Sequence, residues 1–172
     1  MRVLRERKKD EAPIRRVHFD AFRRLERPDD EPPEVALVDE LRASDAWIPG
    51  LSLVAVIESE VVGHVCTTRG RVDEEPVLAL GPIGVLLAHQ GRGIGTALVR
   101  HTLGLSESLG EPLIALLGSN TYYGRFGFEP SFRHGIEPPD PNWGHRFQVK
   151  ILDRKRGSII GKFRYPPPFD AS

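Results

Sequence analysis

One stretch in the middle of the 172-residue chain, residues 81–95, constrains most strongly what the chain can fold into. It reads GPIGVLLAHQGRGIG and continues directly into TALV. The apolar run carrying Val and Ile predicts a buried strand. The glycine-spaced turn after it predicts the start of an amphipathic helix over about residues 92–109, with Leu98, Leu103 and Leu105 in the core. We therefore expect a strand, a glycine turn and a helix in direct succession.

The glycine turn also predicts an anion site. Gly91, Gly93 and Gly95 lie on alternate positions and let the backbone approach a ligand closely. The first amides of a helix have no partner within the helix, and together with the helix dipole they favour a phosphate or pyrophosphate group. Arg92 adds a positive charge beside them.

The spacing of the turn separates three ligand classes. No Lys-Ser or Lys-Thr pair follows the glycines, which excludes a P-loop. A dinucleotide-binding turn is weakly matched, because the third glycine falls one position early and the turn lies in mid-chain. The pattern that fits is Q-x-x-G-x-G, formed by Gln90, Gly93 and Gly95. In this pattern the sequence resembles the GNAT superfamily of N-acyltransferases, whose pyrophosphate loop binds acetyl-coenzyme A.

A second stretch, residues 116–128, supports the resemblance independently. It reads LLGSNTYYGRFGF and resembles the closing segment of the bacterial branch of the family, in which a Tyr precedes a Gly-Phe pair by four residues. Tyr123 and the pair Gly127-Phe128 satisfy that spacing. About 30 residues divide the two motifs, which leaves room for one helix and one short strand.

The resemblance implies a GNAT fold of the mixed α/β (α+β) type. Its central sheet would be mostly antiparallel, with about six to seven strands, about four flanking helices and a splay between the fourth and fifth strands. Hydrophobic periodicity agrees, predicting helices over residues 12–25 and from about 35 to 46. It predicts strands over residues 2–7, 51–57, 61–68, 77–86, 113–117, 147–152 and 158–163, an ordered loop over 133–145 and an extended proline tail at 166–168.

Composition limits the partners and the location of the protein. The chain carries 24 Lys and Arg against 24 Asp and Glu, so it has no net charge with which to gather nucleic acid or an anionic membrane. Cys66 is the only cysteine, and no apolar run approaches the about 20 residues that span a bilayer. We expect a single cytoplasmic domain over residues 1–172 that needs no metal.

Residues for the coenzyme follow from the resemblance. Ile83, Gly84 and Val85 would pair with the pantetheine arm in the gap between the splayed strands, with a bulge at Gly84. The Ile83 amide would be the oxyanion donor. The remaining candidate coenzyme-binding residues are Gln90, Gly91, Arg92, Gly93, Ile94, Gly95, Thr96 and, on a separate segment, Asn120.

Tyr123 would act as the general acid that protonates the departing thiolate. A phenol with a pKa of about 10 keeps its proton at neutral pH and can donate it to a thiolate whose conjugate acid has a pKa of about 8.5. The alternative is that Tyr122 and Tyr123 are two packed aromatic residues that cap a short helix.

The general base is the largest open question. Histone-modifying members of the family place a Glu four residues before the position of Ile83, where this chain has Ala79. If strands 61–70 and 77–86 pair across their hairpin, His64 lies opposite Ile83 on the same face and becomes the candidate base. A slip of one residue would move it to the other face, leaving a hydrogen-bonded structural histidine. Glu26, Glu31 and Glu34 are further options.

The resemblance implies an acetyl-CoA-dependent N-acetyltransferase that acts on a primary amine of a small molecule or peptide by direct attack in a ternary complex. Acidic residues in the predicted loops favour a cationic acceptor, and an aromatic wall would come from Trp47 or Trp143. The acidic residues are Asp29, Asp30, Glu31, Glu137 and Asp140. A non-catalytic acyl-CoA-binding sensor or scaffold, a longer acyl group, a hydroxyl acceptor and a homodimer all remain open.

Overall fold

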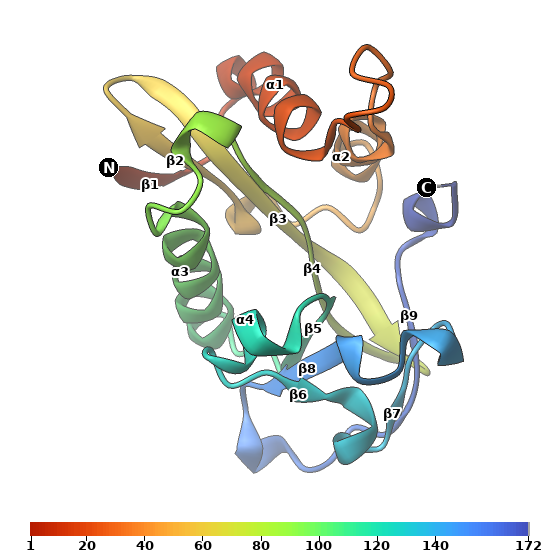
Figure 1. The fold of residues 1–172 in the computed structure, drawn as a ribbon. Helices are drawn as coiled ribbons and strands as arrows, with labels where there is room; N and C mark the ends of the chain where they lie inside the picture. Colours follow the sequence, from red (N-terminus) through yellow and green to blue (C-terminus); the bar gives the residue numbers. More distant parts are fainter. Residues whose placement is uncertain (172) are drawn as a thin grey trace.

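The computed structural model describes residues 1–171, which form a nine-stranded sheet with four α-helices around it (Figure 1). The strands are β1 (Arg2–Arg5), β2 (Ser52–Ile57), β3 (Glu60–Val72), β4 (Glu75–Val85), β5 (Leu113–Leu117), β6 (Glu129–Pro130), β7 (Ile136–Glu137), β8 (Phe147–Ile151) and β9 (Gly161–Arg164). The main strand order is β1-β2-β3-β4-β5-β8-β6, and β9 pairs with both β3 and β7. Only the β4–β5 and β7–β9 pairs are parallel. The mostly antiparallel sheet is confirmed, and β6 and β7, of two residues each, bring the number of strands above the expected six to seven.

The four expected helices are present, with shifted ends. They are α1 (Glu11–Phe22), α2 (Pro33–Arg42), α3 (Ile94–Ser108) and α4 (Asn120–Gly124). Leu98 and Leu103 of α3 are buried as expected, whereas Leu105 is 39% exposed. The proline tail is not extended, because a 3-10 turn covers Pro167–Ala171.

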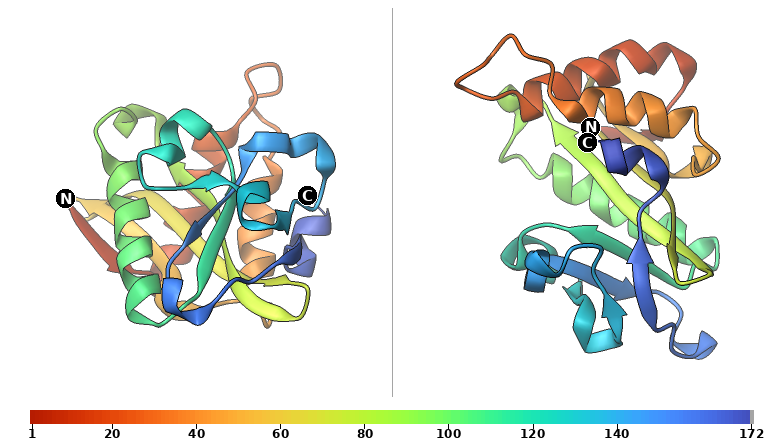
Figure 2. Two further views of the ribbon diagram at one scale, coloured as in Figure 1. Left: turned by 90° about the horizontal axis from the view of Figure 1, so that it is seen from below. Right: turned by 90° about the vertical axis from the view of Figure 1, so that its right-hand side faces the viewer.

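Helices cover both faces of the sheet. The helices α1 and α2 lie on one face and α3 lies on the other (Figure 2). A Cβ added to Gly84 on β4 would meet His18 and Ala21 of α1. A Cβ added to Gly63 on β3 would instead meet the side chains of α3. Side chains that alternate along β3 and β4 therefore face α1 or α3 in turn.

Strand β4 separates from β5 after a short parallel pairing. The paired residues are Leu78 with Ile114 and Ala79 with Ala115, while the pairing of β4 with β3 continues to Val85. The Leu86 amide donates to the Val62 carbonyl at 2.9 Å. Since hydrogen-bonding directions alternate along a strand, the backbone groups of Ile83 and Val85 point away from β3, into the gap. The predicted splay is confirmed.

A β-bulge in β4 changes the register that the sequence predicts. Val65 pairs with Ile83 and Thr67 with Leu80, so the bulge falls at Gly81-Pro82. Proline has no N–H to donate to the ladder, which explains why the pairing is interrupted there. Gly84 is regularly paired with His64. A bulge at Gly84 and a pairing of His64 with Ile83 were therefore wrong predictions.

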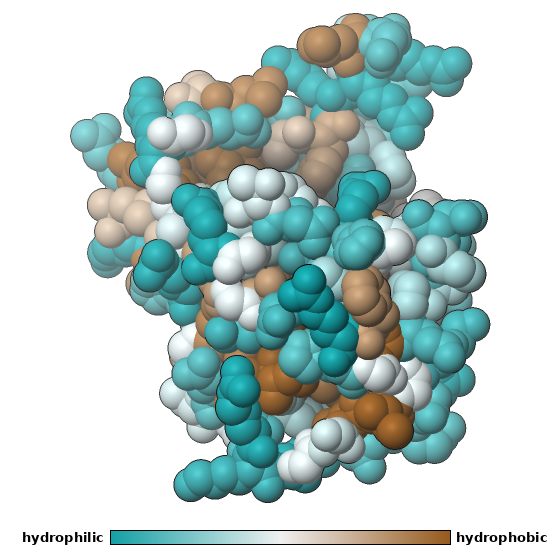
Figure 3. Space-filling view, turned by 60° about the horizontal axis from the view of Figure 1, so that its bottom comes forward, coloured by the Kyte–Doolittle hydropathy of each residue, from teal (hydrophilic) through white to brown (hydrophobic). Residues whose placement is uncertain are grey.

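The surface is predominantly hydrophilic on the face shown in Figure 3, with hydrophobic areas visible between the polar side chains. The exposed large hydrophobic residues include Leu25, Phe132 and Ile160. Single hydrophobic residues at the surface are ordinary in folded proteins. Within residues 1–171, every helix is too short or too polar to cross a bilayer.

Candidate active site

The glycine turn opens helix α3 as the sequence predicts. Gly91 and Gly93 have φ angles of 77° and 82°, in the left-handed region that favours glycine. Gly93 is the N-cap residue, and its carbonyl accepts the first helical hydrogen bond, from the Ala97 amide at 3.0 Å. The amides of residues 94–96 therefore have no partner within the helix. The Gln90 side chain donates to the Val85 carbonyl at 3.0 Å and ties the turn to the end of β4.

A cavity of about 510 Å³, here called the glycine-loop cavity, lies between this turn, the end of β4, α1 and α4. It brings together most of the residues predicted to bind the coenzyme. The lining comprises Ala21, Phe22, Ile83, Gly84, Val85, His89, Gln90, Gly91, Gly93, Ile94, Gly95, Thr96, Tyr122, Tyr123 and Arg125. Arg92 is exposed and lies outside this lining, as does Asn120, whose side chain donates to the His145 carbonyl at 2.7 Å.

Arg125 is a cavity residue that the sequence reasoning missed. Its guanidinium carbon lies 4.5 Å from the centroid of the Tyr122 ring, and its Nη2 lies 3.5 Å from Thr96 Oγ1. Arg125 therefore places a positive charge at the first turn of α3, where Arg92 was expected to place one. Its position inside the Tyr-Tyr-Gly-Arg segment was the available signal, but the contact depends on how α4 lies against α3.

A larger cavity of about 1120 Å³, here called the aromatic cavity, adjoins the glycine-loop cavity. It is lined by residues of α1, α2, β4, β5 and the C-terminal segment, among them Trp143, Phe163, Tyr165 and Phe169. Glu34, Asp140 and Asp170 bring carboxylates to it. Three residues, Phe22, Ile83 and Tyr123, line both cavities.

Several residues expected near an acceptor lie elsewhere. Trp47 is outside the lining of both cavities, and the Arg42 guanidinium lies 5.3 Å from the centroid of its ring. Glu31 pairs with Arg15 at 2.9 Å on the surface. Of the two tryptophans and the three candidate glutamates, Trp143 and Glu34 are the ones that reach the aromatic cavity.

Tyr123 is held in place at the junction of the two cavities. A Cβ on Gly118 would lie 2.5 Å from Tyr123 Cε2, so the absence of a side chain at residue 118 makes room for the ring. Tyr122 and Phe128 contact the ring edge-on, at centroid distances of 4.9 and 5.9 Å. Burial, with a smaller effect of Tyr122, raises the pKa of the Tyr123 phenol to about 12. Tyr123 is therefore protonated at neutral pH and able to donate.

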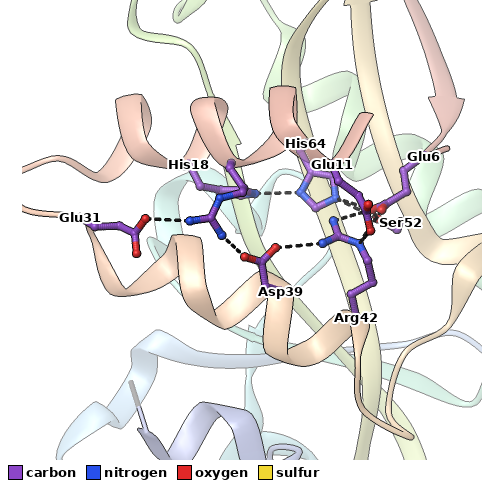
Figure 4. A network of polar contacts seen from close by, with 9 residues as sticks. Glu6, Glu11, His18, Glu31, Asp39, Arg42, Ser52 and His64 are labelled. Carbon is purple, nitrogen blue, oxygen red and sulfur yellow. Dashed lines mark hydrogen bonds and ion pairs between the residues drawn. The ribbon is translucent and has the colours of Figure 1, made fainter. Parts of the chain in front are cut away.

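His64 belongs to a buried polar network on the α1 face of the sheet (Figure 4). Its Nδ1 lies 2.8 Å from His18 Nε2, and its Nε2 lies 2.8 Å from Ser52 Oγ. His64 lines neither cavity and is fully buried. The expectation that it faces the reacting groups directly was wrong, because the bulge at Gly81-Pro82 pairs it with Gly84 and turns it toward α1.

Glu6 anchors the far end of this network. Ser52 Oγ donates to one of its oxygens, and Arg42 Nε donates to the other at 2.7 Å. Burial alone would raise the pKa of Glu6, but hydrogen bonds from His64, Arg42 and Ser52 outweigh it and lower the pKa to about 2. Burial lowers the pKa of both His64 and His18, so both imidazoles are neutral near pH 7.

Comparison with known proteins identifies the family. Residues 19–128 match the sequence profile of the Acetyltransferase (GNAT) family. The chain belongs to this family. The uncharacterized N-acetyltransferase YjhQ of Escherichia coli (strain K12) is 35% identical over 127 residues, which are 72% of this chain and 66%, just under two thirds, of that protein.

Solved GNAT structures agree with the fold over almost the whole chain. The family member YhbS from Escherichia coli, in complex with CoA, has a TM-score of 0.87 at 25% identity, with 98% of this chain and 91% of that chain covered. A GNAT acetyltransferase from Brucella melitensis, in complex with acetyl-CoA, has a TM-score of 0.78 at 32% identity, with 98% and 97% covered.

Because of this polar network, we expect the stability of the folded protein to fall at acidic pH. Below a pH of about 6.5 the unfolded chain binds protons at His18 and His64 more readily than the folded chain does, because folding lowers both pKa values, so stability falls as the pH falls. Between 4.5 and about 2 the protonation of Glu6 removes a further contribution of about 3 kcal/mol. We expect urea denaturation to show a smaller loss of stability in this lower pH range for Glu6→Gln than for the wild type. Glu31→Gln, at an exposed carboxylate, is the control and should behave as the wild type. Equal pH dependence in Glu6→Gln and the wild type would contradict this role of Glu6.

Proposed function

We propose that this GNAT protein is an acetyl-CoA-dependent N-acetyltransferase that transfers the acetyl group to a primary amine by direct attack in a ternary complex. The observation that carries the proposal is the meeting of two cavities at Phe22, Ile83 and Tyr123. One cavity begins at a helix N-terminus suited to a pyrophosphate, and the other is large and aromatic. Two substrates can therefore occupy the site together, with their reacting groups at the shared residues.

The glycine-loop cavity fits the coenzyme chemically. The amides of residues 94–96 and the Arg125 guanidinium supply donors and positive charge for the pyrophosphate. The backbone groups of Ile83 and Val85 point into the gap between β4 and β5, where an amide-bearing pantetheine arm finds partners. The relatives of known structure that contain CoA and acetyl-CoA support this assignment.

Two residues at the junction have roles in the transfer. Bound acetyl-CoA supplies an activated thioester carbonyl. The Ile83 amide is the donor for the negative charge that develops on the carbonyl oxygen as the amine attacks. Tyr123 donates its proton to the departing thiolate, and its raised pKa keeps it in the donating form at neutral pH.

The acceptor is a primary amine carried on an apolar or aromatic body. The aromatic cavity supplies the walls through Trp143, Phe163 and Tyr165, and the carboxylates of Glu34 and Asp140, which also line it, are partners for an ammonium group. Arg146 and Lys162 also line it, which favours an acceptor with a polar or anionic group away from the amine.

Calorimetric titration with acetyl-CoA tests the coenzyme site. The wild type should bind with a micromolar Kd, about −8 kcal/mol. Gly93→Asp should abolish binding, because it places a carboxylate at the pyrophosphate position and a side chain at a φ of 82°. Gly104→Asp makes the same charge change at an exposed position of α3 and should bind as the wild type. Folding of both variants is verified by circular dichroism, and equal binding by all three proteins would overturn the site.

Thiol release across a panel of primary amines, with aromatic and aliphatic members, tests the transfer. We expect Tyr123→Phe to lower kcat by about 100-fold or more while the Kd for acetyl-CoA changes by less than about threefold. Binding of acetyl-CoA without turnover by the wild type would favour a sensor or scaffold instead. Full activity of Tyr123→Phe would remove Tyr123 as the acid.

A further inference from the structure

The direction of every hydrogen bond in the buried network follows from its anchored end. The ionised Glu6 carboxylate can only accept, so the Ser52 hydroxyl donates to it. Ser52 Oγ then accepts from His64 Nε2–H at 2.8 Å. A neutral imidazole carries one N–H, so His64 Nδ1 is an acceptor and His18 Nε2–H donates to it at 2.8 Å.

This order leaves a free lone pair on His18 Nδ1. The atom is buried and has no hydrogen-bond partner among residues 1–171, and the His18 side chain has no exposed surface. An unpartnered buried polar atom is costly unless it has a function or meets a water or ligand. Nδ1 is therefore the end of the network that remains open to a proton.

The free nitrogen lies directly behind the wall of the glycine-loop cavity. A Cβ on Gly84 would be 3.0 Å from His18 Nδ1 and 3.3 Å from the Ala21 methyl group, so the backbone of Gly84, without a side chain, packs directly against Nδ1. Gly84 and Ala21 line the cavity. The His18 ring also stacks on Phe22, which lines both cavities, with a centroid distance of 5.9 Å and an interplanar angle of 12°.

We propose that His18 is the general base of the transfer, its Nδ1 taking the proton of the acceptor amine through one water molecule admitted between Phe22 and Gly84. His64, Ser52 and Glu6 are positioning residues that hold the imidazole in the basic tautomer. This assignment rests on the proposed function. It supplies a general base in a chain that has Ala79 where histone-modifying family members have a Glu, and in which His64 lines neither cavity.

The proton and electron count closes. The ammonium of the acceptor gives one proton to His18, and the resulting neutral amine forms the new N–C bond as the C–S bond breaks. Tyr123 gives its proton to the thiolate, and the second proton lost by the amine nitrogen restores Tyr123. His18⁺ returns the proton on its Nδ1 to the solvent through the same water molecule, which restores the basic tautomer while Nε2–H stays bonded to His64. The net reaction is an amide, free CoA and one released proton.

The surroundings of His18 favour its neutral form, while two acidic residues lie near the neighbouring His64. Burial, and to a smaller extent His64 and Arg42 of α2, lower the pKa of His18 and disfavour a permanent charge on it. Glu6 after β1 and Asp10 before α1 lie toward His64 and compensate positive charge once it spreads along the two rings. Base activity needs only the neutral imidazole, which is already the resting form at a pH of about 6.5, so the wild-type rate should not change with pH above that value.

His18→Gln tests the proposal, since the glutamine amide can still donate to His64 Nδ1 but has no basic atom. Two acceptors of similar shape are compared: the most active alkylamine of the panel, with a pKa of about 10, and a fluorinated analogue with a pKa below about 7. With the alkylamine at neutral pH, kcat should fall by about 100-fold and then rise about tenfold per pH unit. With the analogue, which is already neutral, the loss should be less than about threefold.

The controls separate a base from a structural role. His101→Gln, at an exposed histidine of α3, should retain wild-type activity with both amines. The Kd of His18→Gln for acetyl-CoA should equal that of the wild type. Equal losses with both amines, or no loss with either, would overturn the role of His18.

A second measurement is independent of the acceptor. Imidazole nitrogen NMR of the wild type should find His18 with a protonated Nε2 and an unprotonated Nδ1, and Glu6→Gln should alter that tautomer balance. A protonated Nδ1 in the wild type would overturn the proposal. A wild type that turns over no amine would instead count against the proposed transferase function.

Discussion

The structure depends on the separation of β4 from β5. After Ala79 pairs with Ala115, β4 has a hydrogen-bonded partner on one edge only, and its other edge faces open space. An unpaired strand edge is usually a liability, because it invites association with another chain. In this fold the edge lies inside the molecule, between α1, α3 and α4, so its free backbone groups are available to a ligand while the surrounding elements restrict access.

The free edge of β4 and its α1-facing side have different roles. Backbone groups of Ile83 and Val85 point into the gap, and the glycine turn and Arg125 continue the binding surface beyond the strand. Gly84, between them, faces α1 and brings the end of a buried hydrogen-bonded network close to the cavity. The bulge at Gly81-Pro82 sets this arrangement, since a register shifted by one residue would exchange the two faces.

The sequence predicted the local features and missed those that depend on long-range packing. The turn of Gly91 and Gly93 is a local motif, and the apolar strand before it and the helix after it were placed within a few residues. Predicting which residue pairs with His64 required knowing where the β-bulge in β4 lies. The sequence favoured Gly84 as the place of that bulge, whereas the structure has it at Gly81-Pro82. The contact of His18 with His64 joins residues 46 positions apart and could not be predicted, because it depends on how α1 packs against β3.

Hydrogen–deuterium exchange with and without acetyl-CoA tests the central claim most directly, because it reports on backbone amides one segment at a time. The account predicts that acetyl-CoA slows exchange at residues 83–85 and 91–96 and leaves β1 and β2 unchanged. Slowed exchange at a different part of the sheet, with 83–85 and 91–96 unaffected by saturating acetyl-CoA, would contradict the assignment of the gap beside β4 as the coenzyme site.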